Sequence, residues 1–419
     1  MILHIRHSWL KRGTFARWIH SSRSELEFRL GNIEKMDFSG MEPFDYIIIS
    51  DLLPLLHDVQ KTLESLHTVC TPHTRLVITY HSNLWRPVLA AATLLGRRSP
   101  DTSYNWLSTH DIENLLHLSG FEAITHSGHT LLPVRLPGLN WLMNRFLAKV
   151  PLFNQLCLIW RIIARPCPKV GTEKTDSEQL TVSIVIPTRN EKNNIEQVFT
   201  RTPKLGKWTE LVFVDGNSDD GTVEEINRCI DKYGQQWHRV VLLHQSGEGK
   251  GQAVRHGFAE CRAEVLMILD SDLTMPPEEL PKYYGAIVSG KGEFINGCRL
   301  VYPMEKQAMR FLNMMGNYFF ACLFTWLLGQ RVKDTLCGTK VLWRRDYEKI
   351  VVNRSYFGDF DPFGDFDLLF GASHLNRKII DMPIRYQPRS YGDIKISRWR
   401  HGWLLLRMSF IAFRKLKLS

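Results

Sequence analysis

Asp270 and Asp272 lie two residues apart, directly after the apolar run Val265–Leu269. Carboxylates at this spacing, projected from the end of a strand, can hold a hard divalent cation through oxygen. A cation there would bridge a diphosphate and neutralise the charge that develops on a leaving nucleotide. A merely solvated turn is the alternative reading of an Asp-x-Asp pair, and the preceding apolar run favours the metal site.

Three polar loops upstream carry groups that suit a nucleotide. The first is PTRNE at 187–191, and the second is DGNSDDGT at 215–222. Acidic side chains there can accept hydrogen bonds from a base or a ribose, although a capped strand-to-helix turn explains the second loop equally well. In the third, GEGKG at 247–251, backbone N–H groups and Lys250 can cradle phosphate oxygens. Its spacing is not that of a P-loop, so by itself this loop is a weak signal.

The elements between these loops follow an α/β pattern. Continuous β-branched or aliphatic runs alternate with helical spacing, which predicts a parallel sheet covered on both faces. The runs are Val182–Ile186, Leu211–Val214, Val240–Leu243 and Val265–Leu269. Ligands bind beyond the carboxyl ends of the strands in such sheets. We therefore expect the polar loops to meet at one edge of the sheet.

Length and composition predict two folded domains. The 419 residues exceed one typical domain, and 44% hydrophobic with 23% charged residues excludes fibrous and disordered chains. A polar, Pro- and Gly-containing stretch at 166–180 predicts a linker between an α/β domain at 1–165 and a second one at 181–419. The net charge of +10 favours anionic partners, and eight cysteines without a C-x-x-C pair fit a reducing compartment.

The order of the motifs in the second domain resembles the family 2 glycosyltransferases with a GT-A fold. The closest branch is that of dolichyl-phosphate mannose synthase, whose members act on polyprenyl phosphates. The segments that carry the resemblance are SIVIPTRNE at Ser183–Glu191, VDGNSDDGT at Val214–Thr222, GEGKGQAVRHG at Gly247–Gly257, LDSDLTMPPEEL at Leu269–Leu280, DTLCGTK at Asp334–Lys340 and RSYGDIK at Arg389–Lys395.

The resemblance implies roles for residues of this chain. The donor-binding residues would be Pro187, Thr188, Glu191, Asp215, Lys250 and Asp270. Asp270 and Asp272 would hold Mg²⁺ or Mn²⁺, with Thr274 at a position where relatives often have Gln as a further ligand. The acceptor-phosphate clamp would consist of Arg299, Arg310, Arg389 and Lys395. Asp365 or Asp367 would be the catalytic carboxylate near the acceptor, where it orients the acceptor or removes a proton.

The implied reaction is inverting transfer of a sugar from a nucleotide-diphosphate sugar to a polyprenyl phosphate. It would occur at the cytoplasmic face of the membrane, with the protein bound peripherally. One alternative is transfer onto a sugar hydroxyl of a polysaccharide or glycolipid, and a second is a non-catalytic relic that only binds. The basic loop Arg385–Lys395 favours a phosphate acceptor. Nucleic acid is not an expected partner, because no helix-turn-helix, zinc-finger or RNP-type pattern occurs.

Two segments bear on membrane contact. Phe311–Gln330 has no charged residue, and we interpret it as a helix partly buried and partly touching a membrane surface rather than spanning it. The basic, aromatic segment 399–419 fits an interfacial helix on anionic lipid and an ordinary terminal helix equally well. The polyprenyl acceptor implied by the resemblance favours membrane contact.

The segment 44–166 resembles the latter half of a class I S-adenosylmethionine-dependent methyltransferase. FDYIIISDLL at Phe44–Leu53 is one of the segments that carry this likeness. The upstream strand and Gly-x-Gly loop of a complete member are not expected, because Gly13 is the only glycine before Gly31. The domain should then look truncated, from about residue 30 onward, and S-adenosylmethionine is not an expected cofactor. We expect Asp51, His57, His126 and His129 to be structural or surface residues rather than catalytic groups or metal ligands.

Overall fold

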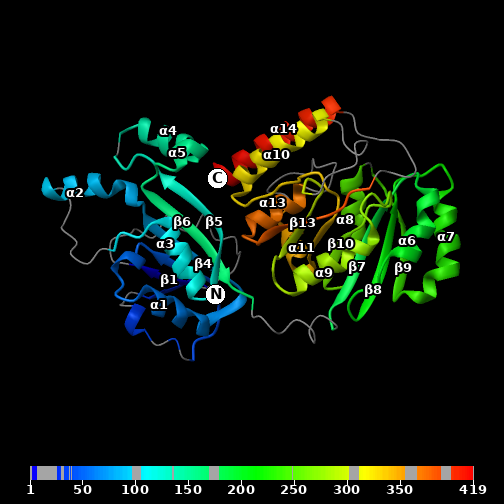
Figure 1. Ribbon diagram of the computed structural model, residues 1–419, viewed down its shortest axis with the longest axis horizontal. Helices are drawn as coiled ribbons and strands as arrows, with labels where there is room; N and C mark the ends of the chain where they lie inside the picture. The colour runs from blue at the N-terminus through cyan, green and yellow to red at the C-terminus, as the bar shows by residue number, and fades with distance from the viewer. Residues whose placement is uncertain are drawn as a thin grey trace. The chain divides into compact units, whose positions relative to one another are not determined.

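The computed structural model describes residues 2–6, 26–29, 33–36, 38, 40–96, 105–134, 136–168, 179–247, 249–301, 311–353, 366–387 and 398–418. The chain divides into two compact units, Met1–Pro168 with Lys417–Ser419, and Lys169–Leu416 (Figure 1). Each unit has its own sheet and its own apolar core.

The first unit is built on a six-stranded sheet in the order β2-β1-β3-β4-β6-β5. Its strands are β1 (Ile2–Arg6), β2 (Leu26–Arg29), β3 (Phe44–Ser50), β4 (Cys70–His81), β5 (Phe121–Thr130) and β6 (Ile159–Pro166). The first four pair in parallel, and β6 runs antiparallel to both of its neighbours. As a result β5 runs in the same direction as β4, and both strands end at the same edge of the sheet.

The expected absence of an upstream strand is wrong. Strand β1 lies between β2 and β3, pairs in parallel with both, and buries Leu3 completely. The sequence does not predict this strand because it is only five residues long and no glycine motif follows it. The strand is stabilised by pairing with a neighbour on each side. The chain between β1 and β2 does contain Gly13 alone as a glycine.

The helices of the first unit are α1 (Val59–Ser65), α2 (Arg86–Leu94), α3 (Thr109–Leu118), α4 (Leu139–Arg145) and α5 (Pro151–Asn154). Helix α3 starts with a capping box, in which Ser108 and Asp111 each bind the other's backbone N–H. It buries Ile112 and Leu116 against the sheet. In contrast, α2, α4 and α5 bury none of their residues.

The second unit is built on a seven-stranded sheet in the order β13-β11-β12-β10-β7-β8-β9. Its strands are β7 (Thr181–Thr188), β8 (Trp208–Asp215), β9 (Arg239–His244), β10 (Val265–Ile268), β11 (Phe294–Cys298), β12 (Lys340–Trp343) and β13 (Ile379–Pro383). The four predicted apolar runs are β7 to β10 and pair in parallel, which confirms the α/β fold class. Strand β12 is antiparallel to both β10 and β11, so it starts at the edge where they end.

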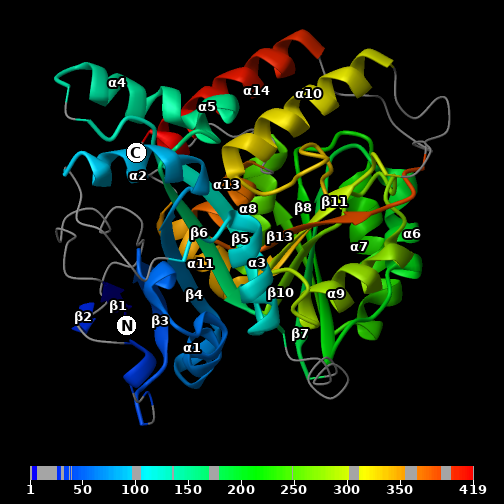
Figure 2. The ribbon, with the colours of Figure 1, turned by 60° about the vertical axis from the view of Figure 1, so that its left-hand side comes forward.

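Helices cover both faces of this sheet (Figure 2). They are α6 (Lys192–Arg201), α7 (Thr222–Tyr233), α8 (Lys250–Glu260), α9 (Leu280–Val288), α10 (Phe311–Leu328), α11 (Arg344–Val352), α13 (Phe366–His374) and α14 (Arg398–Ala412). Successive side chains of β7 enter different apolar clusters, since Ile184 and Ile186 lie in one and Val185 lies in the other. A strand buried on both faces explains why the run is continuously apolar.

Helices α10 and α14 lie side by side in both views of the second unit (Figures 1 and 2). Trp326 of α10 stacks on Phe413, which follows α14, with ring centroids 5.5 Å apart. Helix α10 buries Phe324 and exposes Phe319, so the described part of this segment is partly buried, as predicted. Of the helices that the structure describes, none combines the length and the apolar character needed to cross a membrane.

Candidate active site

The carboxyl edge of the second sheet gathers the predicted donor-binding residues. Asp215 is the last residue of β8, and its side chain is almost completely buried. Its Oδ2 accepts a hydrogen bond from the Ser218 N–H at 3.2 Å, whereas its buried Oδ1 has no hydrogen-bond partner among the described residues. A buried carboxylate oxygen without a partner is costly, so this oxygen is positioned for a donor supplied by a ligand.

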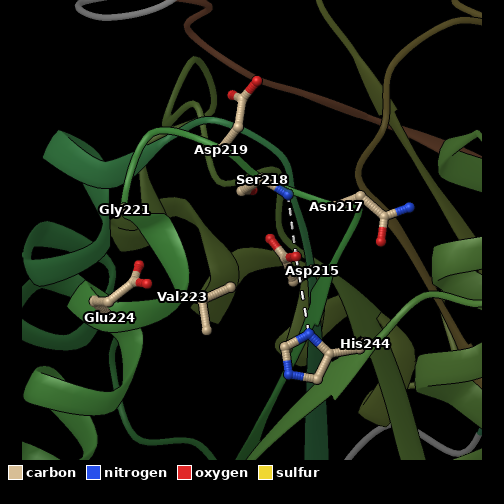
Figure 3. Close-up of a pocket in the computed structure, with 8 residues that line it drawn as sticks. All are labelled: Asp215, Asn217, Ser218, Asp219, Gly221, Val223, Glu224 and His244. Atoms are coloured by element: carbon tan, nitrogen blue, oxygen red, sulfur yellow. Dashed lines mark hydrogen bonds and ion pairs between the residues drawn. The ribbon is translucent and has the colours of Figure 1, made fainter.

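A cavity of about 430 Å³ opens beside this carboxylate. Its lining residues come from the ends of β8 and β9 and from the start of α7: Asp215, Asn217, Ser218, Asp219, Gly221, Val223, Glu224 and His244. Figure 3 shows the Asp215 carboxylate between Ser218 and His244, whose Nδ1 lies 3.9 Å from Oδ2. The size and the polar lining of the cavity suit a small ligand that forms hydrogen bonds.

The loop after β7 joins its neighbours through backbone and side-chain bonds. The Thr188 carbonyl accepts from the Gly216 N–H at 2.8 Å, and the Pro187 carbonyl accepts from the Ser271 hydroxyl at 3.0 Å. Glu191 is buried, and its Oε2 accepts from the Asn194 side chain at 2.7 Å. The Thr188 and Pro187 contacts join the loop after β7 to the loops after β8 and β10, whereas the Glu191 contact is local.

Lys250 and Asp270 form an ion pair, with Nζ and Oδ1 2.5 Å apart. The loop that precedes β12 packs directly on this pair at Gly338. A Cβ at that position would lie 2.1 Å from Asp270 Oδ2 and 2.2 Å from Lys250 Nζ. Only a glycine therefore allows the backbone to approach the pair this closely.

Asp272 is held by Thr274, the residue predicted as a further metal ligand. The Thr274 N–H and hydroxyl donate to Asp272 Oδ1 at 3.1 Å and 2.8 Å. The described residues contain no group of three His, Cys, Asp or Glu side chains that could hold a metal ion. Two carboxylates on one loop still fit a hard divalent cation, provided that water or ligand oxygens complete its coordination.

Arg299, a predicted acceptor-phosphate ligand, forms a buried bidentate ion pair with Asp334. Its Nε and Nη2 donate to the two carboxylate oxygens at 2.7 Å and 2.8 Å. Burial by itself would raise the pKa of Asp334, but the charge of Arg299 and its hydrogen bonds outweigh that effect and lower the pKa. The other predicted acceptor ligands, Arg310, Arg389 and Lys395, lie outside the described residues.

Of the two predicted catalytic carboxylates, the structure describes Asp367, whereas Asp365 lies outside the described residues. Asp367 lies in the first turn of α13, and its Oδ2 is 3.1 Å from Nη1 of Arg255 in α8. Both side chains are largely buried, so the pair links the two helices.

Several residues of the site were not singled out from the sequence. His244 ends a strand and carries no motif, whereas Asp334 and Gly338 lie in DTLCGTK, whose motif was noted without a role for either residue. Only the fold brings Asp334 to Arg299, 35 positions away along the chain. The sequence signal that could have identified Asp334 and Gly338 is the segment DTLCGTK, in which small and charged residues come directly before the short apolar run of β12.

The first unit has its own polar group at the carboxyl end of β3. Asp51 has a positive φ of 49°, and its Oδ1 lies 3.9 Å from Nδ1 of His81. Burial raises the pKa of Asp51, although the neighbouring His81 opposes this shift. The backbone N–H of His57 donates to Glu34, which is a structural contact.

Comparison with known proteins identifies two families in the chain. Residues 183–351 match the model described as glycosyl transferase family 2, and residues 16–123 match a methyltransferase domain. The second match begins upstream of residue 30, in agreement with the presence of β2 in the first sheet.

Relatives of the second unit are named for transfer to polyprenyl phosphates. A dolichol-phosphate mannosyltransferase of Saccharomyces cerevisiae is 38% identical over 111 residues, 25% of this chain and 40% of that protein. Another, from Pyrococcus furiosus, is 36% identical over 228 residues, 52% of this chain and 59% of that protein. An undecaprenyl-phosphate 4-deoxy-4-formamido-L-arabinose transferase of Enterobacter sp. is 26% identical over 225 residues, 52% of this chain and 63% of that protein.

The chain thus spans between two fifths and about two thirds of the length of these relatives. The matched residues begin within β7 and continue through α11, so they include the loops that carry Asp215, Lys250, Asp270 and Gly338. The chain therefore carries a family 2 glycosyl transferase domain at residues 183–351, preceded by a segment of the methyltransferase domain family at residues 16–123.

Proposed function

We propose that the second unit transfers a sugar from a nucleotide-diphosphate sugar to a polyprenyl phosphate, with inversion at the anomeric carbon. The names of the relatives support this class of acceptor. The observation that carries the proposal is the contact of Lys250, Asp270 and Gly338, which brings a cation, a carboxylate and a close backbone together at the carboxyl edge.

In this proposal the cavity beside Asp215 receives the nucleoside. The unpartnered Oδ1 accepts a hydrogen bond from the base or the ribose. Lys250 then leaves Asp270 for the donor diphosphate, and Asp270 and Asp272 hold Mg²⁺ or Mn²⁺. When bound, the metal supplies positive charge where the leaving diphosphate becomes more negative. Thr274 keeps Asp272 oriented through its two hydrogen bonds.

The acceptor phosphate is already an anion, so its oxygen needs no general base to attack the anomeric carbon. Asp367, fixed by Arg255, therefore orients groups near the acceptor in the proposed reaction. The bonds from Arg299 to Asp334 use Nε and Nη2, which leaves Nη1 for a phosphate oxygen. Arg310, Arg389 and Lys395 complete the proposed acceptor clamp.

We further propose that the protein works peripherally at the cytoplasmic face of a membrane. Helix α14 buries Leu405 and Met408 in the core and exposes Trp403 and Phe410, which supports contact with lipid. The reaction has no role for S-adenosylmethionine.

The test uses the full chain, a divalent metal, a polyprenyl phosphate in detergent, and radiolabelled UDP- and GDP-sugars. We expect label in the lipid extract, and we expect Asp272→Ala to abolish it. Asp231→Ala, which removes an exposed carboxylate of α7, is the matched control and should retain activity. Transfer only to sugar or glycolipid hydroxyls would replace the proposal with the hydroxyl-acceptor alternative. The absence of transfer to both acceptor classes would favour a binding module.

A further inference from the structure

Helix α2 of the first unit exposes an apolar surface. Its sequence, RPVLAAATL, has one charged residue, and none of its side chains is buried. Leu94 is 89% exposed, and Leu95, directly after the helix, is 73% exposed. A helix of this composition usually packs into a core, so its exposure indicates a partner.

The segment with α4 and α5 exposes apolar side chains in the same way. Trp141 is 57% exposed and Leu152 is 72% exposed, and Leu142 lies beside Trp141 with half of its surface in solvent. The interior of this segment is a separate small apolar cluster around Leu131, Ala148 and Cys157, supported by hydrogen bonds from Leu131 N–H and Leu132 N–H to the Asn144 side chain. The fold of the segment therefore does not require these large apolar groups on its outside.

The two regions form one surface, because both follow strands that end at the same edge. Helix α2 follows β4, α4 follows β5, and these strands run in the same direction. The indole N–H of Trp85, just before α2, donates to the Leu156 carbonyl, just after α5, at 2.9 Å. Figures 1 and 2 both show α2, α4 and α5 at the upper end of this unit. We call this surface the apolar face, defined by Val88, Leu94, Leu95, Trp141, Leu142 and Leu152.

The two sequence stretches that supply the apolar face contain basic residues and no acidic residue. No acidic residue occurs between Glu64 and Asp101, or between Glu122 and Glu173, and these two stretches supply the whole face. They contain several basic residues, of which Arg86 begins α2 and Arg145 ends α4. A partner that binds apolar groups and carries negative charge fits this face.

We propose that the apolar face docks on a membrane that contains anionic lipids. The apolar side chains enter the boundary between headgroups and acyl chains, while the two arginines contact lipid phosphates. Short helices that lie on a surface and carry aromatic, aliphatic and basic residues are typical of such contact. This docking lies in the first unit and does not depend on glycosyl transfer by the second.

The test measures co-sedimentation of the full chain with vesicles of phosphatidylcholine, alone or mixed with phosphatidylglycerol. Two double variants, Leu94→Glu with Leu95→Glu and Trp141→Glu with Leu142→Glu, place carboxylates on the face. Each should lower the partition coefficient on anionic vesicles about tenfold or more. Leu118→Glu alters a leucine that is 55% exposed, close to the exposure of Trp141 and Leu142, at the end of α3 outside the face, and should bind as the wild type does.

Unchanged vesicle binding by both double variants would overturn the proposal, and so would equal binding of the wild type to neutral and anionic vesicles. Self-association without lipid that is lost in the variants would assign the face to a second copy of the chain instead. Thermal unfolding checks that the variants fold, since exposed positions should leave it unchanged. No sugar is present in the assay, so a failed glycosyl-transfer experiment leaves this result interpretable.

Discussion

Gly338→Ala tests whether the close approach of backbone to the Lys250–Asp270 pair matters for catalysis. The new Cβ would lie 2.1 Å from Asp270 Oδ2 and 2.2 Å from Lys250 Nζ. Non-bonded atoms pack at about 3.5–4 Å, so both side chains must retreat by more than about 1 Å. Gly338 itself lies outside the left-handed region, so alanine causes no backbone strain there.

The expected result separates stability from activity. Both displaced atoms are ends of side chains near solvent, so the free energy of unfolding should change by less than about 1 kcal/mol. A displacement of about 1 Å at a reacting group can cost about a hundredfold in rate. We therefore expect kcat/KM for glycosyl transfer to fall about a hundredfold, or about 2.7 kcal/mol of transition-state stabilisation.

The assay combines initial-rate kinetics with urea unfolding of the same preparations. Gly285→Ala in α9 is the matched control, because a Cβ there meets no atom within 4 Å. It should keep full activity. Wild-type kcat/KM in Gly338→Ala would refute the reasoning, because the displaced pair would then have no part in the reaction. A large loss of stability would also refute it, since the contact would then be structural.

Three further outcomes follow from the buried charges. Asp334→Asn should lower the free energy of unfolding by about 3–5 kcal/mol in urea titrations, because Arg299 loses its buried counter-ion; Glu278→Gln, which breaks an exposed pair, should cost less than about 1 kcal/mol. The pKa of Asp334 is lowered in the folded protein, so its stabilisation is present above the unfolded pKa of about 3.9 and is lost as the pH falls through the lower folded value. The free energy of unfolding of Asp334→Asn should therefore not show this loss below pH 4. If the wild type and the variant lost stability identically as the pH falls below 4, the loss could not be assigned to Asp334. Asp215→Asn should raise the Kd of the nucleoside diphosphate about tenfold or more in calorimetry without lowering stability, because it removes a charge whose Oδ1 has no described partner; a loss of stability with unchanged Kd would contradict this.

The parallel core of the second unit was predictable from the sequence because each of its strands is buried on both faces. The runs that became β7, β8, β9 and β10 are continuously apolar for that reason. Their shared direction places Asp215 and Asp270 at the same edge of the sheet. This arrangement predicts that the loops after these strands lie at one edge, whereas the donor-binding roles of their residues are implied by the resemblance to the family 2 glycosyltransferases.

The pairings between distant segments were not predictable. Arg299 was expected to meet a phosphate, yet the fold places the carboxylate of Asp334 against it. Thr274 was expected to face a metal, and its hydroxyl is directed at Asp272. Strand β1 is not predictable because its five residues are too few to show a strand pattern, and its stability comes from pairing with β2 and β3. The Arg299–Asp334 contact and the pairing of β1 come from tertiary structure, which periodicity and spacing do not encode, whereas the Thr274–Asp272 bond is local.

Because β12 is antiparallel to β11, the segment that connects the two strands can vary in length without disturbing the sheet. Strand β11 ends, and β12 starts, at the same edge of the sheet, so the excursion from Arg299 to Thr339 leaves and returns at one place. Helix α10 belongs to this excursion. Closing a longer loop costs only about 0.6 kcal/mol for each doubling of its length. Insertions between the end of α10 and Asp334 would therefore cost little chain entropy, while β12 keeps its register and Gly338 stays against Asp270.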